Sequence, residues 1–426
     1  MPDTSAQSTA GTGLGRVNAW LLGLLACALP LSTSAVSVFA VLLILLGLIE
    51  GSWWRRRREI LGHPLCAALA CYLALHVLGL LWTSDLLGGC DVLEGMWKLL
   101  LLPLFFTMTG PEWRRRQLAL FLLGMTAAAL ISSLVWADIL HLPGVSPAHP
   151  TKRVFHVIYN PMLALAIFIL LHELLWSEQR PARRAVGTLW LAFLSWNMFI
   201  TEGRTGQVLF FILLIFALFL RFHRRWGRLL LTMALVLPLI FSCAYQVSGN
   251  FQRRIAQVHE ELRVFGMCNN TSVGLRLVYF INSALLIGEH PLIGVGTGDF
   301  QQAYAAMNKR NSEDMPNTDN PHNQYLLTMV RLGLPGLAAL LAMFWCQWRQ
   351  GWSRRDPLWR LQLAFPLCFC CIMLADSYLT TYETGILWTF MGAVLYQRTE
   401  DEGQKAEGRG RGTGDSEVSC VAGERE

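Results

Sequence analysis

The chain has 426 residues, of which 54% are hydrophobic and only 15% are charged, with a formal net charge of +6. Soluble globular proteins carry roughly a quarter charged residues. The hydrophobic residues fall into runs of about 17 to 25 residues, the length that spans a bilayer, and this excludes a soluble enzyme. The net charge alone would also suit a nucleic-acid-binding protein, so its location along the chain decides what it means.

The apolar runs predict about twelve membrane-spanning helices, and therefore an all-α polytopic membrane protein. The turn from Pro30 to Ser34 separates two short runs, which leaves open a hairpin that only dips into the membrane. In chain order the predicted spans are 17–31, 34–50, 64–82, 92–109, 117–139, 154–175, 185–200, 205–221, 228–247, 323–346, 360–378 and 384–397.

The basic residues of the short loops indicate the orientation of these spans. Eighteen arginines occupy five alternate loops, beginning with the run from Arg55 to Arg58, whereas the other five loops hold only Lys152, Arg153 and Arg204. The arginine-rich loops are therefore predicted to face the cytoplasm, together with both termini. The positive charge then has a topological explanation, and binding of nucleic acid is not expected.

The chain divides on this basis into five parts. Residues 1–15 and 398–426 have too few apolar side chains to form a packed core and are predicted to be disordered cytoplasmic ends. No cleaved signal peptide is expected, because Arg16 is followed directly by a span without a cleavage site. The other parts are 16–247 with the first nine spans, 248–322 as a periplasmic helical segment, and 323–397 with the last three spans.

Charged residues inside predicted spans are costly to bury and are therefore candidates for function or for pairing. Glu94 and Lys98 lie four residues apart on the fourth span, where they can neutralise each other, and we interpret them as a structural pair. Arg331 and Asp376 lie in the tenth and eleventh spans, and a direct or bridged contact between them is expected. Whether that contact serves the scaffold or a site stays open.

Most of the eleven cysteines lie inside spans, where a thiol acts as a small apolar side chain. Cys90 and Cys268 fall at the outer face, so a disulfide between them is conceivable, but the sequence does not require it.

A hairpin at 201–206 contains the first candidate binding residue. Arg204 stands between two glycines at the start of an apolar span, so free backbone N–H groups, the positive end of a helix and a guanidinium come together. This combination binds anionic oxygens well. An arginine that snorkels to the membrane interface would give the same pattern, and the hairpin alone does not separate the two interpretations.

The outer segment contains a predicted helix over 272–287, which starts at a capping run of Asn, Thr and Ser residues and ends at Gly288. Its apolar positions follow helical spacing, so it is expected to lie along the membrane surface with Arg276 pointing up or inward. The segment 248–322 holds six basic and seven acidic residues, so Arg276 is not part of a general basic coat. The glycine-rich run 294–298 lacks the preceding strand and the GK[ST] ending of a phosphate loop and is interpreted as a turn.

The segment 319–323 contains the candidate general base. Asn320 suits a helix N-cap and Pro321 the first helical position, which would place His322 in the first turn of the tenth span at the outer surface. A helix N-terminus disfavours an imidazolium, so the ring is expected to stay neutral and able to accept a proton. An ordinary exposed loop histidine is the alternative.

In this order, these elements resemble the shared core of the O-antigen ligase and O-antigen polymerase superfamily, which also includes the bacterial protein O-oligosaccharyltransferases. The resemblance covers residues 201–340, and its last part is similar to the His-[Asn/Ser]-x-x-Leu signature of the ligases. The three matching parts are Gly203-Arg204-Thr205-Gly206, then Gly274-Leu275-Arg276 leading to Gly288–Gly296, then His322-Asn323-Gln324-Tyr325-Leu326 leading to Gly333-Leu334-Pro335-Gly336.

The resemblance implies transfer of a glycan from undecaprenyl pyrophosphate to an acceptor at the periplasmic face of the inner membrane. Arg204 and Arg276 would then hold the pyrophosphate, with Lys152 and Arg153 as weaker candidates for the same headgroup. His322 would deprotonate the acceptor hydroxyl or otherwise assist its attack.

Two further residues are implied as supporting groups. Asn323 follows the histidine in the signature, and Asp376 would orient His322 or an arginine. The chain departs from the family at Arg331, where related sequences often carry an acidic residue, so the role of Arg331 is open.

The expected chemistry needs no cofactor. A lipid pyrophosphate is resident in the membrane and is a good leaving group, and two arginines can neutralise it without a metal. The outer side has no D-x-D pair, so metal dependence is not expected. Direct displacement by the acceptor would invert the anomeric centre.

Within the superfamily the sequence favours the ligase, which joins O-antigen to the lipid A-core oligosaccharide. The alternatives are a polymerase, which commonly has a less clear histidine signature, and a protein O-oligosaccharyltransferase, which usually has more soluble sequence after the last span. A twelve-span transporter is a remote alternative. Transporters tend to show two related halves with midplane charges, whereas the polar residues here gather in one outer segment.

Overall fold

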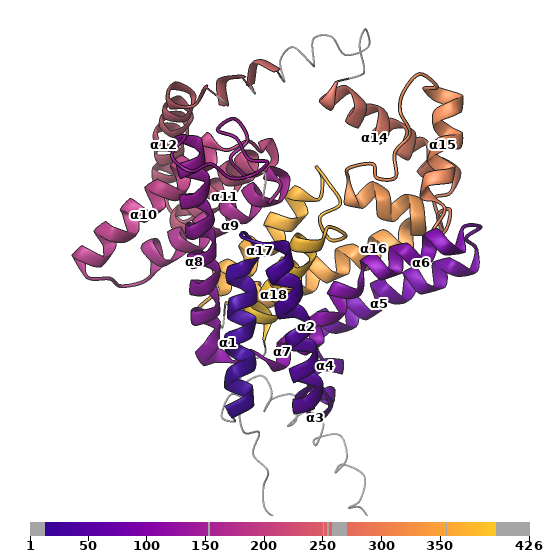
Figure 1. Ribbon diagram of the computed structural model, residues 1–426, viewed down its shortest axis with the longest axis horizontal. Helices are drawn as coiled ribbons and strands as arrows, with labels where there is room; N and C mark the ends of the chain where they lie inside the picture. The colour runs from indigo at the N-terminus through magenta and orange to yellow at the C-terminus, as the bar shows by residue number, and fades with distance from the viewer. Residues whose placement is uncertain are drawn as a thin grey trace, which may run out of the picture.

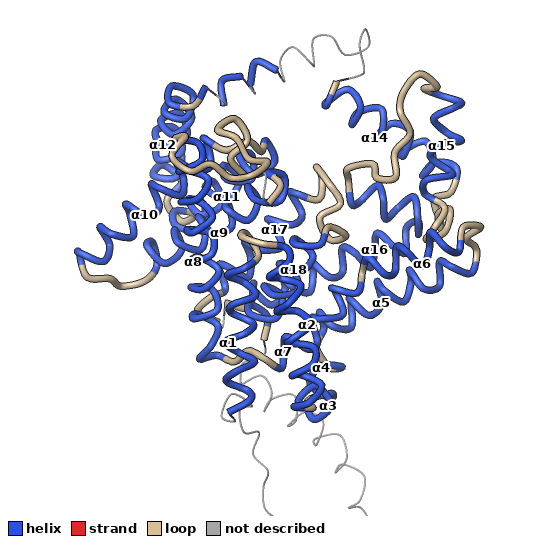
Figure 2. Tube along the Cα trace, in the orientation of Figure 1, coloured by secondary structure: helices blue, strands red, loops and turns tan. Residues whose placement is uncertain are grey.

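The computed structural model describes residues 13–151, 154–249, 251–253, 255–257, 271–354 and 356–397. Every named element in these ranges is helical, which confirms the predicted all-α class (Figure 2). The elements are α1 (Gly13–Ala28), α2 (Thr33–Glu50), α3 (Ser52–Arg55), α4 (Arg57–Leu61), α5 (Pro64–Leu78), η2 (Gly79–Leu81), α6 (Leu86–Gly95), η3 (Trp97–Leu100), α7 (Leu101–Thr107), α8 (Pro111–Trp136), α9 (His156–Trp176), α10 (Pro181–Ile200), α11 (Arg204–Phe222), α12 (Trp226–Val247), α14 (Ser272–Glu289), α15 (Phe300–Asn311), α16 (Gln324–Trp352), α17 (Trp359–Ile372) and α18 (Tyr382–Tyr396).

Seven helical segments are long and apolar enough to cross a membrane by length and composition, and three further apolar segments are shorter. Together with α10 and α18 they occupy the positions of the twelve predicted spans. That all twelve cross the membrane stays a prediction.

α1 begins at Gly13, slightly before the predicted boundary. The rest of the predicted disordered ends, residues 1–12 and 398–426, lie outside the described residues. Cys90 is a free thiol, and Cys268 also lies outside the described residues.

The helices differ in how deeply they are buried. Every residue from Glu383 to Tyr396 in α18 is buried, and α9 has 78% of its span buried against 11% for α12. In Figure 1, α17 and α18 lie in the middle of the bundle, and α10 and α12 lie at its side. The pair α14 and α15 stands at the opposite end of the molecule from α3 and α4. α14 and α15 therefore form a platform at one end of the bundle.

α16 is kinked at Gly333, and the turn after α14 fills the break. Pro335 has no N–H for the carbonyl of Arg331, and the N–H of Gly296 bonds to that carbonyl at 3.0 Å instead. Gly333 has φ 63° and ψ −155°, and a Cβ there would lie 2.4 Å from the backbone of Leu292. The glycine-rich run 294–298 is thus a turn, as predicted, and it docks α14 and α15 onto α16.

The predicted pair of Glu94 and Lys98 is wrong. The fourth predicted span is not one helix: α6 ends at Gly95 and a 3₁₀ turn follows, so the four-residue helical spacing is lost. Lys98 is buried, and its Nζ donates to the carbonyls of Gly95 and Thr380, whereas Glu94 is exposed. The ammonium group of Lys98 thus links the end of α6 to the loop before α18.

The predicted contact between Arg331 and Asp376 is also wrong. Arg331 lies just before the kink of α16, where Tyr72 and Asp319 act on its charge. Asp376 lies in the loop between α17 and α18, at 373–381, and faces His322. The kink of α16 and the loop before α18 keep Arg331 and Asp376 apart. Neither feature can be predicted from the position of a charged residue in an apolar run.

Candidate active site

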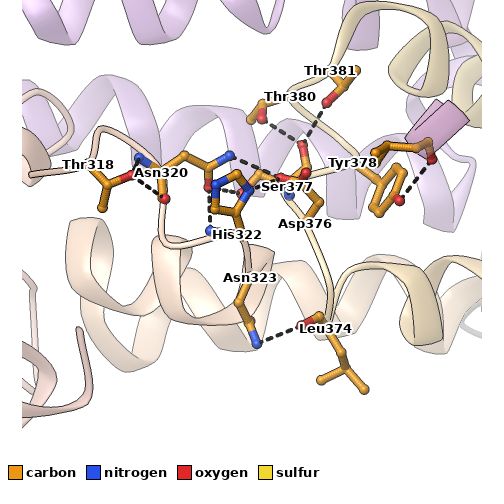
Figure 3. A network of polar contacts seen from close by, with 11 residues as sticks. Thr318, Asn320, His322, Asn323, Leu374, Asp376, Ser377, Tyr378, Thr380 and Thr381 are labelled. Carbon is orange, nitrogen blue, oxygen red and sulfur yellow. Dashed lines mark hydrogen bonds and ion pairs between the residues drawn. The ribbon is translucent and has the colours of Figure 1, made fainter. Parts of the chain in front are cut away.

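His322 lies in a short turn that local hydrogen bonds stabilise (Figure 3). The hydroxyl of Thr318 donates to the carbonyl of Asn320 at 2.7 Å and accepts from its N–H at 3.1 Å. The side-chain oxygen of Asn320 accepts from the N–H of His322 at 3.0 Å. Asn and Thr favour such turns because their short polar side chains reach the nearby backbone. His322 has a φ of 53°, a left-handed conformation that costs a non-glycine residue about 1–2 kcal/mol.

The tenth predicted span begins later than expected. α16 starts at Gln324 with Asn323 as its N-cap, and the Asn323 side chain accepts from the N–H groups of Tyr325 and Leu326. The prediction that Asn320 caps the helix and that His322 lies in its first turn is therefore wrong. Asn320 is engaged in its own turn, so the cap moves three residues on. His322 therefore lies outside the helix, in the turn that precedes its N-cap.

Asp376 faces the ring of His322. Nδ1 of His322 lies 3.2 Å from Oδ1 of Asp376, in a close polar contact that lacks the alignment of a good hydrogen bond. The His322 side chain is 34% exposed and that of Asp376 is 19% exposed. A carboxylate beside Nδ1 favours the tautomer with the proton on Nδ1 and leaves Nε2 as the acceptor. The resemblance implied that Asp376 would orient either His322 or an arginine, and in the structure Asp376 contacts His322.

The Asp376 carboxylate is held in place from two sides. Oδ1 accepts from the Asn320 side-chain amide at 3.1 Å and from the N–H of Ser377 at 2.7 Å. Burial raises the pKa of Asp376, but His322 and these hydrogen bonds outweigh burial, and the pKa lies below its ordinary value. The side chain of Asn323 also donates to the carbonyl of Leu374 at 3.3 Å. The N-cap of α16 and the loop before α18 are thus tied together around the pair.

α14 supplies the wall behind His322. It starts at Ser272, as predicted, with the side chain of Thr271 accepting from the N–H of Gly274 at 3.1 Å. The ring of Tyr279 stacks on His322, with centroids 6.2 Å apart and planes 25° apart. The same ring meets the edge of Tyr304 in α15 at 5.9 Å. Arg276 lies one helical turn before Tyr279, so the helix that supports the histidine also carries the arginine.

Tyr378 connects three parts of the site. Its ring is buried and its hydroxyl donates to the carbonyl of Val157 at 3.0 Å. The side chain of Thr205 and the charges of Asp376 and Arg276 all act on it. Thr205 directly follows Arg204 in the first turn of α11. The start of α11, the arginine of α14 and the acidic residue beside His322 therefore converge on one tyrosine, although they are far apart in the sequence.

The hairpin that carries Arg204 is fixed to α9. The side-chain amide of Asn160 donates to the carbonyl of Glu202 at 2.7 Å, and its oxygen accepts from the hydroxyl of Thr201 at 2.9 Å. Gly203 has a φ of 140°, and a Cβ there would lie 2.4 Å from Nδ2 of Asn160. Only glycine fits this position, because the backbone must pass directly over the amide. Arg204 is the first residue of α11 and is partly buried.

The structure brings together most, but not all, of the predicted site. His322 and Asp376 are in contact, and Asn323 bonds to the carbonyl of Leu374 in the loop that carries Asp376. The charge of Arg276 acts on Tyr378, which also feels the charge of Asp376. Lys152 and Arg153 lie outside the described residues.

Sequence reasoning missed three residues that shape the site, and it gave Asn320 the wrong role, as a helix cap. Each missed residue carried some signal: Asn160 is a polar residue within an apolar span, Tyr279 is one helical turn from Arg276, and Tyr378 is two residues after Asp376.

A sequence model of the family described as O-Antigen ligase matches residues 188–341. The matched range includes Arg204, Arg276 and His322, and it ends before Asp376. No curated protein sequence matches the chain significantly. The three motifs of the resemblance lie inside the matched range, so the family match supports a place for the chain in the O-antigen ligase/polymerase superfamily.

Proposed function

We propose that the protein is an O-antigen ligase, which transfers the O-antigen glycan from undecaprenyl pyrophosphate to the lipid A-core oligosaccharide at the periplasmic face of the inner membrane. The pairing of His322 with Asp376 carries this proposal, because it presents a proton acceptor beside the two arginine-bearing helices. The side chain is partly exposed, so an acceptor hydroxyl has access to the ring.

In the proposed reaction, His322 acts as the general base. The acceptor hydroxyl oxygen attacks the anomeric carbon of the donor, and its proton passes to Nε2 of His322. The bond between the anomeric carbon and the pyrophosphate oxygen breaks, and the electron pair leaves with the pyrophosphate. Asp376 stabilises the imidazolium that forms, as an acidic partner does in other histidine bases. One displacement without an enzyme nucleophile inverts the anomeric configuration.

Arg204 and Arg276 are proposed to bind the pyrophosphate. Arg204 combines a guanidinium with the positive N-terminus of α11. Arg276 approaches from α14 and acts on the same tyrosine that contacts the first turn of α11. Charge-assisted bonds from both sides stabilise the negative charge that develops on the leaving group. Lys152 and Arg153 remain proposed as additional contacts to this headgroup.

The test is glycan transfer in vitro. Purified protein is mixed with undecaprenyl-pyrophosphate-linked O-antigen and rough lipopolysaccharide, with and without EDTA, and products are separated by gel. Wild type should produce a ladder on lipopolysaccharide that survives EDTA, and His322→Ala, Arg204→Ala and Arg276→Ala should lose it. His141→Ala is the matched control, because the His141 side chain is 77% exposed and its contact is with Asp138 in the same loop.

The other outcomes assign the alternatives. Longer lipid-linked chains without modified lipopolysaccharide would identify a polymerase. Transfer to a protein serine instead of lipopolysaccharide would identify a protein O-oligosaccharyltransferase. Substrate flux in proteoliposomes that needs Arg204 and His322 would favour a transporter. A product that keeps the donor's anomeric configuration would contradict the single displacement.

A further inference from the structure

Two arginines and two tryptophans form a stacked row at the end of the bundle opposite His322. The guanidinium of Arg360 lies over Trp176 at 4.7 Å and over Trp359 at 4.4 Å, and Arg354 lies over Trp359 at 4.8 Å. We call these four residues the Arg-Trp ladder. It joins the last residue of α9, the loop after α16 and the first turn of α17. α16 has His322 before its first residue and Arg354 after its last, so the ladder and the candidate active site lie at opposite ends of a 29-residue helix.

The ladder is positively charged. The charges of Arg354 and Arg221 act on Arg360, and Nε of Arg360 is enclosed without a hydrogen-bond partner. Within the described ranges, neither arginine of the ladder forms an ion pair with a carboxylate. Like charges at this spacing repel one another, so an anion between them is stabilising.

Two acidic residues close to the ladder in the sequence are engaged elsewhere, and the exposed Glu178 forms no ion pair with Arg354 or Arg360. Asp356, only two residues after Arg354, pairs with Arg114 and accepts from the N–H of Leu358. Glu173, on the same end of α9 as Trp176, accepts from Ser177 at 2.8 Å. The positive charge of the ladder is therefore not cancelled within this part of the protein.

Stacking fixes the guanidinium groups but leaves their binding edges open. An indole covers the face of a guanidinium, whereas its N–H donors point outward in the plane. Planar N–H donors match phosphate oxygens in a bidentate manner. Tryptophans at the ends of apolar helices typically lie at the level of lipid headgroups. A phosphate that meets this row is thus more readily presented by a lipid than by the aqueous phase.

We propose that the Arg-Trp ladder binds the phosphate headgroup of an anionic phospholipid in the leaflet at the arginine-rich face. This is the face that the loop arginines predict to be cytoplasmic. Basic pockets between membrane helices bind such headgroups in general. The site is separate from the proposed glycan transfer, and neither the lipid nor its binding takes part in that reaction.

Lipid binding to the full chain tests this proposal. Native mass spectrometry of the detergent-solubilised protein measures the affinity for phosphatidylglycerol, with phosphatidylcholine and soluble glycerol phosphate as comparisons. Wild type should bind phosphatidylglycerol most tightly. Each lost arginine near the headgroup should weaken binding about fivefold. The double variant Arg354→Gln/Arg360→Gln should therefore bind about 25-fold more weakly than wild type.

Two further variants keep the result interpretable. Arg354 is exposed, so Arg354→Gln alone should leave the fold intact and still weaken binding about fivefold. Arg183→Gln removes the same charge from an exposed position in the first turn of α10 and should bind the lipid like wild type. Equal affinity in the double variant and wild type would overturn the proposal. So would an equal loss in Arg183→Gln, or binding of glycerol phosphate as tight as that of phosphatidylglycerol.

Discussion

Two basic residues in this protein pair with an aspartate from a distant part of the chain, and the two pairs are surrounded very differently. Arg114 and Asp356 are 7% and 9% exposed, and the Arg114 guanidinium also donates to the carbonyls of Val394 and Leu395 at the end of α18. At the other end of the bundle, the His322 side chain is 34% exposed and its contact with Asp376 is poorly aligned.

The difference separates a pair that holds the fold from a pair that is available for chemistry. All three nitrogens of the Arg114 guanidinium are bonded within the protein, and the last carbonyls of α18 receive partners they would otherwise lack. His322 has a strained backbone, and its neighbours direct Nδ1 toward a carboxylate. Strain of this kind persists where the surrounding structure enforces it and is common at active sites.

The largest effect is expected from His322→Ala. Loss of a general base typically reduces a rate by about 10² to 10⁴-fold, and we expect a decrease in glycan transfer in this range. The unfolding transition should stay close to that of wild type, because the side chain is partly exposed and contributes few buried contacts. Transfer at a rate within a factor of two of wild type would mean that another group accepts the proton.

Arg114→Ala should give the opposite result. Removal of one partner from a buried ion pair costs about 3–5 kcal/mol, because the remaining charge is left buried and unpaired. We expect a large decrease in the free energy of unfolding in detergent and a nearly unchanged transfer rate per folded molecule. Arg183→Gln is the control for loss of an exposed arginine. An unchanged unfolding transition in Arg114→Ala would show that the pair contributes little to the fold.

Asp376→Asn tests the role of the aspartate in the pair of His322 and Asp376. A misplaced reacting group can cost about 10²-fold in rate, and we expect a decrease of about tenfold to a hundredfold in kcat. The KM for the donor should be unchanged, because Asp376 is proposed to orient His322 and not to bind pyrophosphate. A rise in KM without a change in kcat would place Asp376 in donor binding instead.

The lowered pKa of Asp376 gives this variant a signature in acid. The Asp376 carboxylate stabilises the folded state at any pH above about 4, the pKa of an aspartate in the unfolded chain. This stabilisation is lost as the pH falls through the lower pKa that Asp376 has in the folded protein. The wild-type protein should therefore keep this stabilisation from pH 5 to 8 and lose it only below about pH 4. Asp376→Asn should lack this loss, which unfolding measured as a function of pH would detect.

The smallest effect is expected at Tyr279. An aromatic pair contributes about 0.5–1.5 kcal/mol, so loss of the ring in Tyr279→Ala should reduce transfer by about threefold to tenfold. Tyr279→Phe keeps the stacking on His322 and should behave like wild type. A loss in Tyr279→Phe equal to that in Tyr279→Ala would show that the hydroxyl matters and the ring does not.

The helical architecture could be predicted because apolar runs of spanning length have few alternatives in a bilayer. Arg204, Arg276 and His322 also stood out in the sequence, since each lies at the start of a span or on a recognisable helix. The prediction of the helix start is wrong, because it uses Asn320 as the cap and the structure uses Asn323. The side chain of Asn320 instead bonds within its own turn and to Asp376.

Pairings between distant residues were not predictable in the same way. Lys98 and Glu94 fit the helical spacing, yet the helix breaks between them. Arg331 and Asp376 both needed partners, yet the kink at Gly333 and the loop at 373–381 direct them to different neighbours. These contacts depend on where helices bend and how loops return, which a single sequence does not specify.

The most direct test of the account measures transfer rate and unfolding temperature side by side for His322→Ala and Arg114→Ala. We expect His322→Ala to lose transfer with an unchanged unfolding temperature, and Arg114→Ala to unfold at a much lower temperature while its folded fraction still transfers glycan. Two results would contradict the account: transfer by His322→Ala at the wild-type rate, or destabilisation of His322→Ala as strong as that of Arg114→Ala. Either result would mean that the pair of His322 and Asp376 is not the site of chemistry.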